Sequence, residues 1–246
     1  MIYVCIPSYD EGPTVGLVLW KIRKVFEEFP REYQLLVGDD GSSDGTGEIL
    51  ESYTKVLPLT VVRHSRRQGY ARTVEELLHL ALSKSDRPKR DSAILMHADF
   101  SHGPEYLPDF VRRLESGADL VVGEASLSDE PSRRRRLLRR WAPFLLRKVV
   151  RVRGVSDTVS GFVAFRLMTL RTILSRPGAT TLSPEAWATN ALLIGRAAKH
   201  ARQVETVTTV ERHDLRSRAS RTSPWEMVRR VWHAGRQLRD QAPQAP

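Results

Sequence analysis

Residues 35–46 read LLVGDDGSSDGT. An apolar run ends abruptly in the doublet Asp39 and Asp40, and small polar residues lead from there to a helical pattern that begins near Gly45. This order is typical of an α/β sheet, which places charged side chains at the carboxyl ends of its strands, where ligands bind. A helix cap would account for the serines and for one aspartate. Two adjacent carboxylates, however, repel one another unless a cation or a hydrogen-bond donor satisfies them.

Two other apolar runs end in the same way, namely IYVCIPSYDE at residues 2–11 and AILMHAD at residues 93–99. Alternate residues of an extended chain share a face, so His97 and Asp99 can present two ligands on one side. Carboxylates grouped at strand ends suit a nucleotide diphosphate held through a divalent metal, because hard oxygen ligands select Mg²⁺ or Mn²⁺. The alternative for residues 97–99 alone is a loop histidine and a loop aspartate without a ligand.

Strands alternate with helices over the first half of the chain, which predicts a mostly parallel sheet. The expected strands are Ile2–Ile6, Gln34–Gly38, Leu59–Arg63, Ala93–His97 and Leu120–Gly123. The expected helices between them are Thr14–Phe29, Gly45–Tyr53, Gly69–Leu82 and Pro104–Leu114. Beyond Gly123 we expect a basic loop at 126–136, a strand at Ser160–Leu167, a helix at Pro184–Ala198 and a strand at Val204–Val210.

The chain carries a net charge of +10, from 39 Lys and Arg against 29 Asp and Glu, which indicates an anionic partner. Ten of the basic residues and no acidic residue fall in 131–153, where apolar and basic residues interleave as in a helix that lies on an anionic membrane. A solvated helix face is the alternative. Nucleic acid is not an expected partner, because no aromatic platform or nucleic-acid motif accompanies these charges.

The single cysteine, Cys5, lies in an apolar run, so we interpret it as a small core residue and expect a reducing compartment. No apolar run approaches the ~20 residues that a membrane-spanning helix needs. The first residues enter a strand without the basic start and apolar stretch of a signal peptide. We therefore expect a cytoplasmic protein that is peripheral on the cytosolic face of the membrane.

Taken together, the motifs resemble those of family-2 glycosyltransferases of GT-A fold. The resemblance rests on PSYDE at 7–11, DDGSSDGT at 39–46 and HADFSHGPE at 97–105. With DTVSGF at 157–162, the chain is most similar to the branch of dolichol-phosphate (polyprenyl-phosphate) mannose synthases. The resemblance covers roughly residues 1–220. It implies an α/β nucleotide-diphospho-sugar transferase fold, with a mixed, mostly parallel central sheet flanked by helices.

We accordingly expect a single domain over residues 1–236. Its nucleotide-sugar half would be 1–123, and its acceptor-side half 124–236 would contain the basic amphipathic segment 133–153. Residues 237–246 would form a disordered tail. In the family, the residues that line the nucleotide pocket correspond here to Pro7, Tyr9 and Glu11, and those that contact the base and ribose correspond to Asp39 and Asp40.

The stretch from His97 to Asp99 matches the family's metal motif, in which an aspartate stands at both ends. Its first aspartate is His97 here, so Asp99 would still contact the metal. His97 would be either a softer ligand that favours Mn²⁺ or a ribose contact, and His213 could complete the metal site. A bound Mg²⁺ or Mn²⁺ would neutralise the departing diphosphate.

Acceptor-side roles also follow from the resemblance. Asp157, with the Ser-Gly-Phe motif that follows it, matches the acceptor motif, and Glu185 lies where many relatives carry an acid. Either could be a catalytic base, but a phosphate acceptor is already ionised and needs none, so Asp157 could orient instead. The acidic residue at Glu185 is explained equally well as a favourable charge at a helix N-terminus.

Phosphate contacts are expected at two further places. Gly69 begins a helix whose free N–H donors could hold an anion, with a plain basic loop as the alternative. The residues expected to hold phosphates in the late segment are Arg212, Arg216 and Arg218, the last standing where the branch has lysine.

The resemblance implies an inverting glycosyltransferase that moves a hexose, mannose from GDP-mannose, to a polyprenyl or dolichyl phosphate at the cytosolic membrane face. Two alternatives stay open. One is a soluble family-2 enzyme that acts on a small molecule or a glycan. The other is a catalytically decayed relative that binds membrane or nucleic acid, with His97 marking the lost site.

Overall fold

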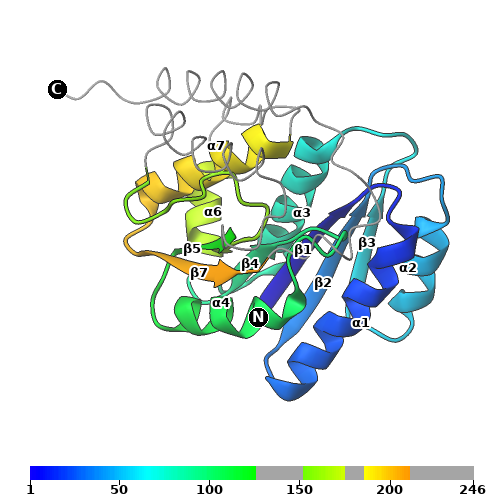
Figure 1. Ribbon diagram of the computed structural model, residues 1–246, viewed down its shortest axis with the longest axis horizontal. Helices are drawn as coiled ribbons and strands as arrows, with labels where there is room; N and C mark the ends of the chain where they lie inside the picture. The colour runs from blue at the N-terminus through cyan, green and yellow to red at the C-terminus, as the bar shows by residue number, and fades with distance from the viewer. Residues whose placement is uncertain (126–151, 175–185, 211–246) are drawn as a thin grey trace.

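The computed structural model describes residues 1–125, 152–174 and 186–210, whose strands form one seven-stranded sheet (Figure 1). The strand order is β3-β2-β1-β4-β6-β5-β7. Strand β6 runs antiparallel to both of its neighbours, β4 and β5, and every other pair is parallel. The prediction of a mixed, mostly parallel sheet flanked by helices is thus confirmed.

The strands are β1 (Ile2–Ser8), β2 (Tyr33–Asp39), β3 (Leu59–Arg63), β4 (Ser92–Leu95), β5 (Leu120–Ala125), β6 (Val163–Arg166) and β7 (Val204–Thr209). The helices are α1 (Gly12–Glu28), α2 (Thr46–Thr54), α3 (Tyr70–Lys84), the 3₁₀ turn η1 (Pro104–Tyr106), α4 (Leu107–Glu115), α6 (Leu167–Leu174) and α7 (Ala186–His200).

The strand predicted at Ser160–Leu167 is shorter in the structure, because β6 starts at Val163 and Leu167 already begins α6. Helix α6 was not predicted. Strand β4 ends at Leu95, two residues before the predicted end, so His97 belongs to the loop. The expected basic loop, most of the segment 133–153 and the tail lie outside the described residues.

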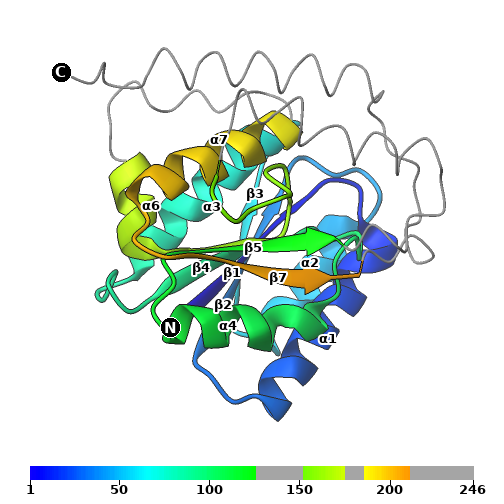
Figure 2. The same ribbon diagram turned by 60° about the vertical axis from the view of Figure 1, so that its left-hand side comes forward.

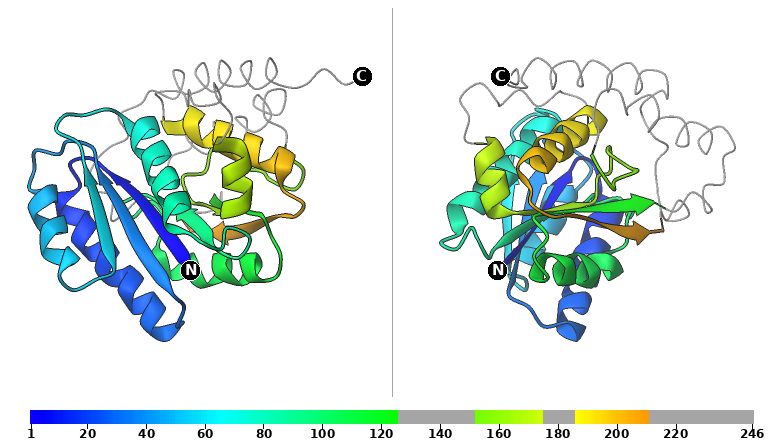
Figure 3. Two further views of the ribbon diagram at one scale, coloured as in Figure 1. Left: turned by 180° about the vertical axis from the view of Figure 1, so that it is seen from behind. Right: turned by 90° about the vertical axis from the view of Figure 1, so that its left-hand side faces the viewer.

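The sheet separates two hydrophobic cores. Helices α3, α6 and α7 cover one face, and α1, α2 and α4 cover the other (Figures 2 and 3). Side chains of β1 alternate between them: Tyr3 and Cys5 enter the α3 core, whereas Val4 and Ile6 enter the α1 core. Cys5 is fully buried, and burial raises the pKa of its thiol, as expected of a core residue.

Within the ranges that the structure describes, no helix combines the length and the apolar character needed to span a bilayer.

Helix α3 packs directly on β2 at Gly38. A methyl group at Gly38 would overlap the γ-methyl of Thr73, so α3 can lie this close only because residue 38 has no side chain. The Thr73 side chain is held in this orientation by its hydroxyl, which donates to the Gly69 carbonyl at 3.2 Å. Strand β2 and the start of α3 are therefore held at one fixed distance.

We predict that Gly38→Ala destabilises the protein by about 1–3 kcal/mol, the usual cost of overpacking a core. Thr73→Ser removes the opposing methyl and keeps the hydroxyl. Gly38→Ala should therefore cost clearly less in the Thr73→Ser background than in wild type, which a double-mutant cycle of urea unfolding would measure. Equal costs in the two backgrounds would show that this contact does not set the distance.

Candidate active site

The predicted donor-side residues come together at the carboxyl ends of four adjacent strands, in the order β3, β2, β1 and β4. Parallel strands end at the same edge of a sheet, and this edge is where α/β folds bind ligands. The residues that follow or end these strands here are His64, Asp39, Asp40, Pro7, Tyr9, Glu11, His97 and Asp99.

Asp39 and Asp40 point to opposite faces of the sheet, because consecutive strand residues alternate. Asp39 lies on the α1 face and is fully buried. Its Oδ1 accepts a hydrogen bond from the Ser42 N–H at 3.0 Å. Its Oδ2 lies 3.3 Å from Nε of Arg63, which is its register partner on β3.

That ion pair is not a well-directed hydrogen bond, so Asp39 Oδ2 remains without a hydrogen-bond partner among the described residues. The same holds for the buried hydroxyl of Ser8. Ser8 and Asp39 are register partners on β1 and β2, so the two unmatched groups are neighbours on one face. Buried polar atoms are almost always hydrogen-bonded in native proteins. This pair therefore has the character of a ligand contact.

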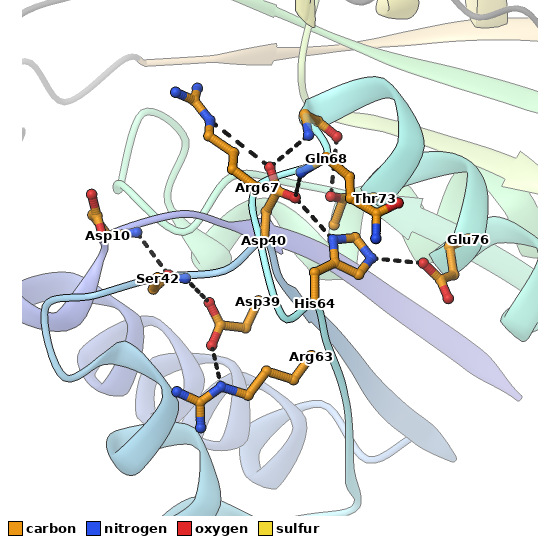
Figure 4. A network of polar contacts seen from close by, with 11 residues as sticks. Asp10, Asp39, Asp40, Ser42, Arg63, His64, Arg67, Gln68, Thr73 and Glu76 are labelled. Carbon is orange, nitrogen blue, oxygen red and sulfur yellow. Dashed lines mark hydrogen bonds and ion pairs between the residues drawn. The ribbon is translucent and has the colours of Figure 1, made fainter.

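Asp40 lies on the α3 face, where its carboxylate is used by the chain itself (Figure 4). Oδ1 accepts from the Gln68 N–H at 2.7 Å and is 2.8 Å from Nδ1 of His64. Oδ2 accepts from the Gly69 N–H at 2.8 Å, and Nε of Arg67 lies 4.0 Å away. The Gly69 N–H, one of the donors at the start of α3, is therefore already taken by Asp40 in this structure.

His64 is a site residue that the sequence analysis missed. Its buried ring is bonded at both nitrogens, with Nε2 2.8 Å from Oε2 of Glu76 on α3 (Figure 4). Burial lowers the pKa of His64, but the hydrogen bonds to Glu76 and Asp40 outweigh it, and the pKa is raised above the ordinary value. A signal did exist: Arg63 ends β3 and His64 follows it, just as Asp39 ends β2 and Asp40 follows it.

The rest of the DDGSSDGT motif ties the loop after β1 to the loop after β2. The Asp10 N–H donates to the hydroxyl of Ser42 at 2.9 Å, and the Ser43 N–H donates to Oδ1 of Asp10 at 2.9 Å. Asp44 accepts from the N–H groups of Gly12 and Thr46. Burial raises the pKa of Asp44, but these bonds and the Thr46 hydroxyl outweigh burial and lower it overall.

Glu11 and Tyr9 also have partners at this edge. The Glu11 N–H donates to the hydroxyl of Thr46 at 3.0 Å, and the Glu11 carbonyl accepts from the first turn of α1. The guanidinium of Arg67 lies over the Tyr9 ring, 4.2 Å from its centroid. The expected wall of the nucleotide pocket is thus an aromatic ring paired with a cation.

Asp10 and Phe100 are the non-glycine residues with left-handed backbone in the described ranges, with φ of 51° and 59°. Both lie in loops at this same edge of the sheet. Such conformations cost roughly 1–2 kcal/mol each and collect at functional sites. Phe100 compensates by burying its ring, and Asp10 by binding Ser43.

His97 lies between Tyr70, at the start of α3, and Gly161, in the predicted acceptor motif. Its ring stacks on Tyr70 with centroids 5.5 Å apart, and a methyl group at Gly161 would overlap its Nε2. The Tyr70 hydroxyl donates to Oδ1 of Asn190 on α7 at 3.0 Å, and the Asn190 amide donates to the Val159 carbonyl at 3.4 Å. The loop after β4, the start of α3 and the predicted acceptor motif therefore form one packed cluster.

Asp99 is held by Ser101, whose N–H donates to Oδ1 at 2.9 Å and whose hydroxyl donates to the same atom. No three His, Cys, Asp or Glu side chains of the described part of the chain gather as a metal site, and His213 lies outside it. One carboxylate nevertheless fits Mg²⁺ or Mn²⁺, because such cations are commonly bound by one or two carboxylates together with substrate phosphates.

On the predicted acceptor side, Asp157 supports its own loop, since its Oδ1 accepts from the Val159 N–H at 3.1 Å. The N–H groups of Ser156 and Asp157 donate to Oε1 of Glu124, at the end of β5. Sequence reasoning missed Glu124, although it comes after an apolar run near the end of its strand. The remaining predicted site residues lie outside the described part: Glu185, Arg212, His213, Arg216 and Arg218.

The family model described as Glycosyl transferase family 2 matches residues 3–174. The dolichol-phosphate mannosyltransferase of Pyrococcus furiosus is 25% identical over 168 residues, which cover 66% of this chain and 45% of that protein. The undecaprenyl-phosphate mannosyltransferase of Micrococcus luteus is 29% identical over 174 residues, which cover 68% of this chain and 67% of that protein. The chain thus spans between about half and two thirds of these relatives.

Among solved structures, glucosyl-3-phosphoglycerate synthase from Mycobacterium tuberculosis superposes with a TM-score of 0.68 at 18% identity, covering 100% of this chain and 82% of that chain. A complex of that enzyme with Mn²⁺, uridine diphosphate and glucosyl-3-phosphoglycerate gives a TM-score of 0.65 at 20% identity, covering 100% and 81%. The likeness shows that this chain has the GT-A fold.

We predict that Gly161→Ala destabilises the protein by about 1–3 kcal/mol, because its methyl group would force the His97 ring off Tyr70. In a His97→Ala background the ring is gone, and the same change should cost under about 1 kcal/mol. Chemical unfolding of the four proteins measures both costs. An unchanged cost in the His97→Ala background would show that the destabilisation does not come from the contact with the His97 ring.

Proposed function

The chain belongs to glycosyl transferase family 2, and we propose that it is an inverting transferase that moves mannose from GDP-mannose to a polyprenyl phosphate. The carrying observation is the carboxyl edge of β1 to β4, which bears Ser8, Asp39 and Asp99. The two similar mannosyltransferases, which are named for dolichol phosphate and undecaprenyl phosphate, support mannose as the sugar and a lipid phosphate as the acceptor.

The donor base is assigned to the α1 face of this edge. Asp39 Oδ2 and the Ser8 hydroxyl are buried there without hydrogen-bond partners among the described residues. A carboxylate only accepts hydrogen bonds, whereas a hydroxyl both donates and accepts. A ring N–H of the base on Asp39, with an adjacent polar atom on Ser8, would satisfy both. Tyr9 and Arg67 are assigned to the wall of the pocket, where the cation covers the ring.

Asp99 is assigned to the diphosphate end of the donor. Its carboxylate, fixed through Ser101, would hold a divalent cation together with the phosphates. The chemistry supplied by the bound cation is neutralisation of the negative charge that develops on the leaving diphosphate. His97 is packed between Tyr70 and Gly161 and precedes Asp99 by two residues in the same loop, where it suits a contact with the donor.

In the transfer itself, an oxygen of the acceptor phosphate attacks the anomeric carbon from the side opposite the diphosphate. The bond from that carbon to the diphosphate oxygen breaks, and the configuration inverts. A phosphate needs no base, so Asp157 is assigned to hold the acceptor loop, as its bond to the Val159 N–H indicates. We assign Arg212, Arg216 and Arg218 to the acceptor phosphate and the basic segment 133–153 to the cytosolic membrane face, from the sequence alone.

The donor is identified by thermal unfolding with GDP-mannose, UDP-glucose and the two nucleoside diphosphates, with and without Mn²⁺. A ligand at one hundred times its Kd stabilises the folded state by about 2.7 kcal/mol. We expect a metal-dependent rise in Tm with GDP-mannose, followed by transfer of labelled mannose to polyprenyl phosphate in liposomes. Transfer to a water-soluble acceptor instead would favour the soluble alternative, and no binding of any sugar nucleotide would favour the decayed relative.

We predict that Asp99→Asn lowers kcat/KM for this transfer by at least about 100-fold, because a carboxamide lacks the negative charge that would hold the cation. The Mn²⁺-dependent part of the Tm rise should disappear with it. Asp109→Asn is the matched control, since Asp109 is an exposed carboxylate on α4 paired with Arg112. Full activity of the Asp99→Asn protein would contradict the assignment.

A further inference from the structure

The imidazole of His64 lies between two carboxylates that face it from different elements. Asp40 approaches Nδ1 from the end of β2, and Glu76 approaches Nε2 from α3, each at 2.8 Å (Figure 4). Ionised carboxylates only accept hydrogen bonds, so both contacts are satisfied only when both ring nitrogens carry a proton. A neutral ring would set one nitrogen lone pair against a carboxylate oxygen.

Asp40 also binds the loop that precedes α3. It accepts from the N–H groups of Gln68 and Gly69, and it lies 4.0 Å from Arg67. Residue 41 must be glycine for the loop to pack this closely, because a methyl group there would lie 2.7 Å from the backbone of Arg67. The loop is thus seated on the end of β2, and Asp40 is the group that fastens it.

The same loop carries a side chain of the donor pocket. Arg67 lies over the Tyr9 ring and remains largely exposed to solvent, so its position depends on its backbone more than on surrounding packing. Movement of residues 66–69 would therefore move the cation away from Tyr9. His64 itself is buried and does not reach the pocket side of Asp39, which belongs to the other face of the sheet.

We propose that His64 is a positioning residue for donor binding: its doubly protonated ring holds Asp40, Asp40 holds residues 66–69, and these hold Arg67 against Tyr9. The inference rests on the proposed function, because donor affinity is its readout. The charged groups around the ring are Asp40, directly after β2, and Glu76 on α3. Arg67 lies behind Asp40, and Arg63 is paired with Asp39 on the opposite face.

The sign of the pH dependence follows from the protonated state. The two carboxylates raise the pKa of His64 above its ordinary value despite burial. Donor binding should accordingly be tight below the ordinary imidazole pKa and should weaken as the pH rises through the raised value. Removing the charge of Glu76 should move this loss of affinity to lower pH, because one of the two groups that favour the charged ring is then gone.

The test is the Kd of GDP-mannose with Mn²⁺, measured by calorimetry for wild type and three variants from pH ~6 to ~8.5, a range that begins below the ordinary imidazole pKa and extends above it. Glu76→Gln should keep the wild-type Kd at the acidic end and lose affinity at a lower pH than wild type. Its carboxylate is partly exposed, so folding should survive. His64→Gln should bind several-fold more weakly at the acidic end, without the pH dependence. Glu51→Gln, an exposed change on α2, should match wild type.

A wild-type pH profile in the Glu76→Gln protein, or an unchanged pH dependence in the His64→Gln protein, would overturn the inference while leaving the proposed donor binding intact. Absence of GDP-mannose binding by wild type at every pH would overturn the proposed function and the inference together. An NMR titration of the His64 ring, assigned by the signal that His64→Gln removes, should give the same midpoint as the Kd profile. A different midpoint would also overturn the inference.

Discussion

Two buried carboxylates stand next to each other at the end of β2, and the structure depends on giving each one its own cation. Strand alternation solves this, because it sends Asp39 and Asp40 to opposite faces of the sheet. The neighbouring strand β3 ends in two basic residues that alternate in the same way, so Arg63 meets Asp39 and His64 meets Asp40. Each carboxylate is thereby compensated where an uncompensated buried charge would be strongly destabilising.

The two faces then serve different purposes. On the α1 face, Asp39 keeps an acceptor atom unmatched beside the Ser8 hydroxyl among the residues that the structure describes, which is the chemistry of a binding group. On the α3 face, Asp40 is engaged by backbone N–H groups and an imidazole, which is the chemistry of an anchor. Two adjacent aspartates that look equivalent in the sequence therefore have different surroundings: Asp39 keeps an unmatched oxygen, and Asp40 is bonded to the loop beside it.

The sequence predicted the parts of the fold that depend on local pattern. Apolar runs and helical periods placed β1 to β5 and α1 to α4, and the strand ends placed the candidate site. Helix α6 was missed because no glycine or proline between Phe162 and Leu174 separates β6 from the helix. Tertiary contacts were also out of reach. The partner of Asp40 is 24 residues away, and the groups bound by Glu124 are 32 and 33 residues away.

The matched doublets also restrict how this part of the chain can change in length. A shift of one residue between β2 and β3 would exchange the faces, and would set the Arg63 guanidinium toward the buried slot that accepts a flat imidazole. Insertions and deletions inside β2 or β3 are therefore not tolerable, since a single added residue would leave both aspartates facing the wrong cation.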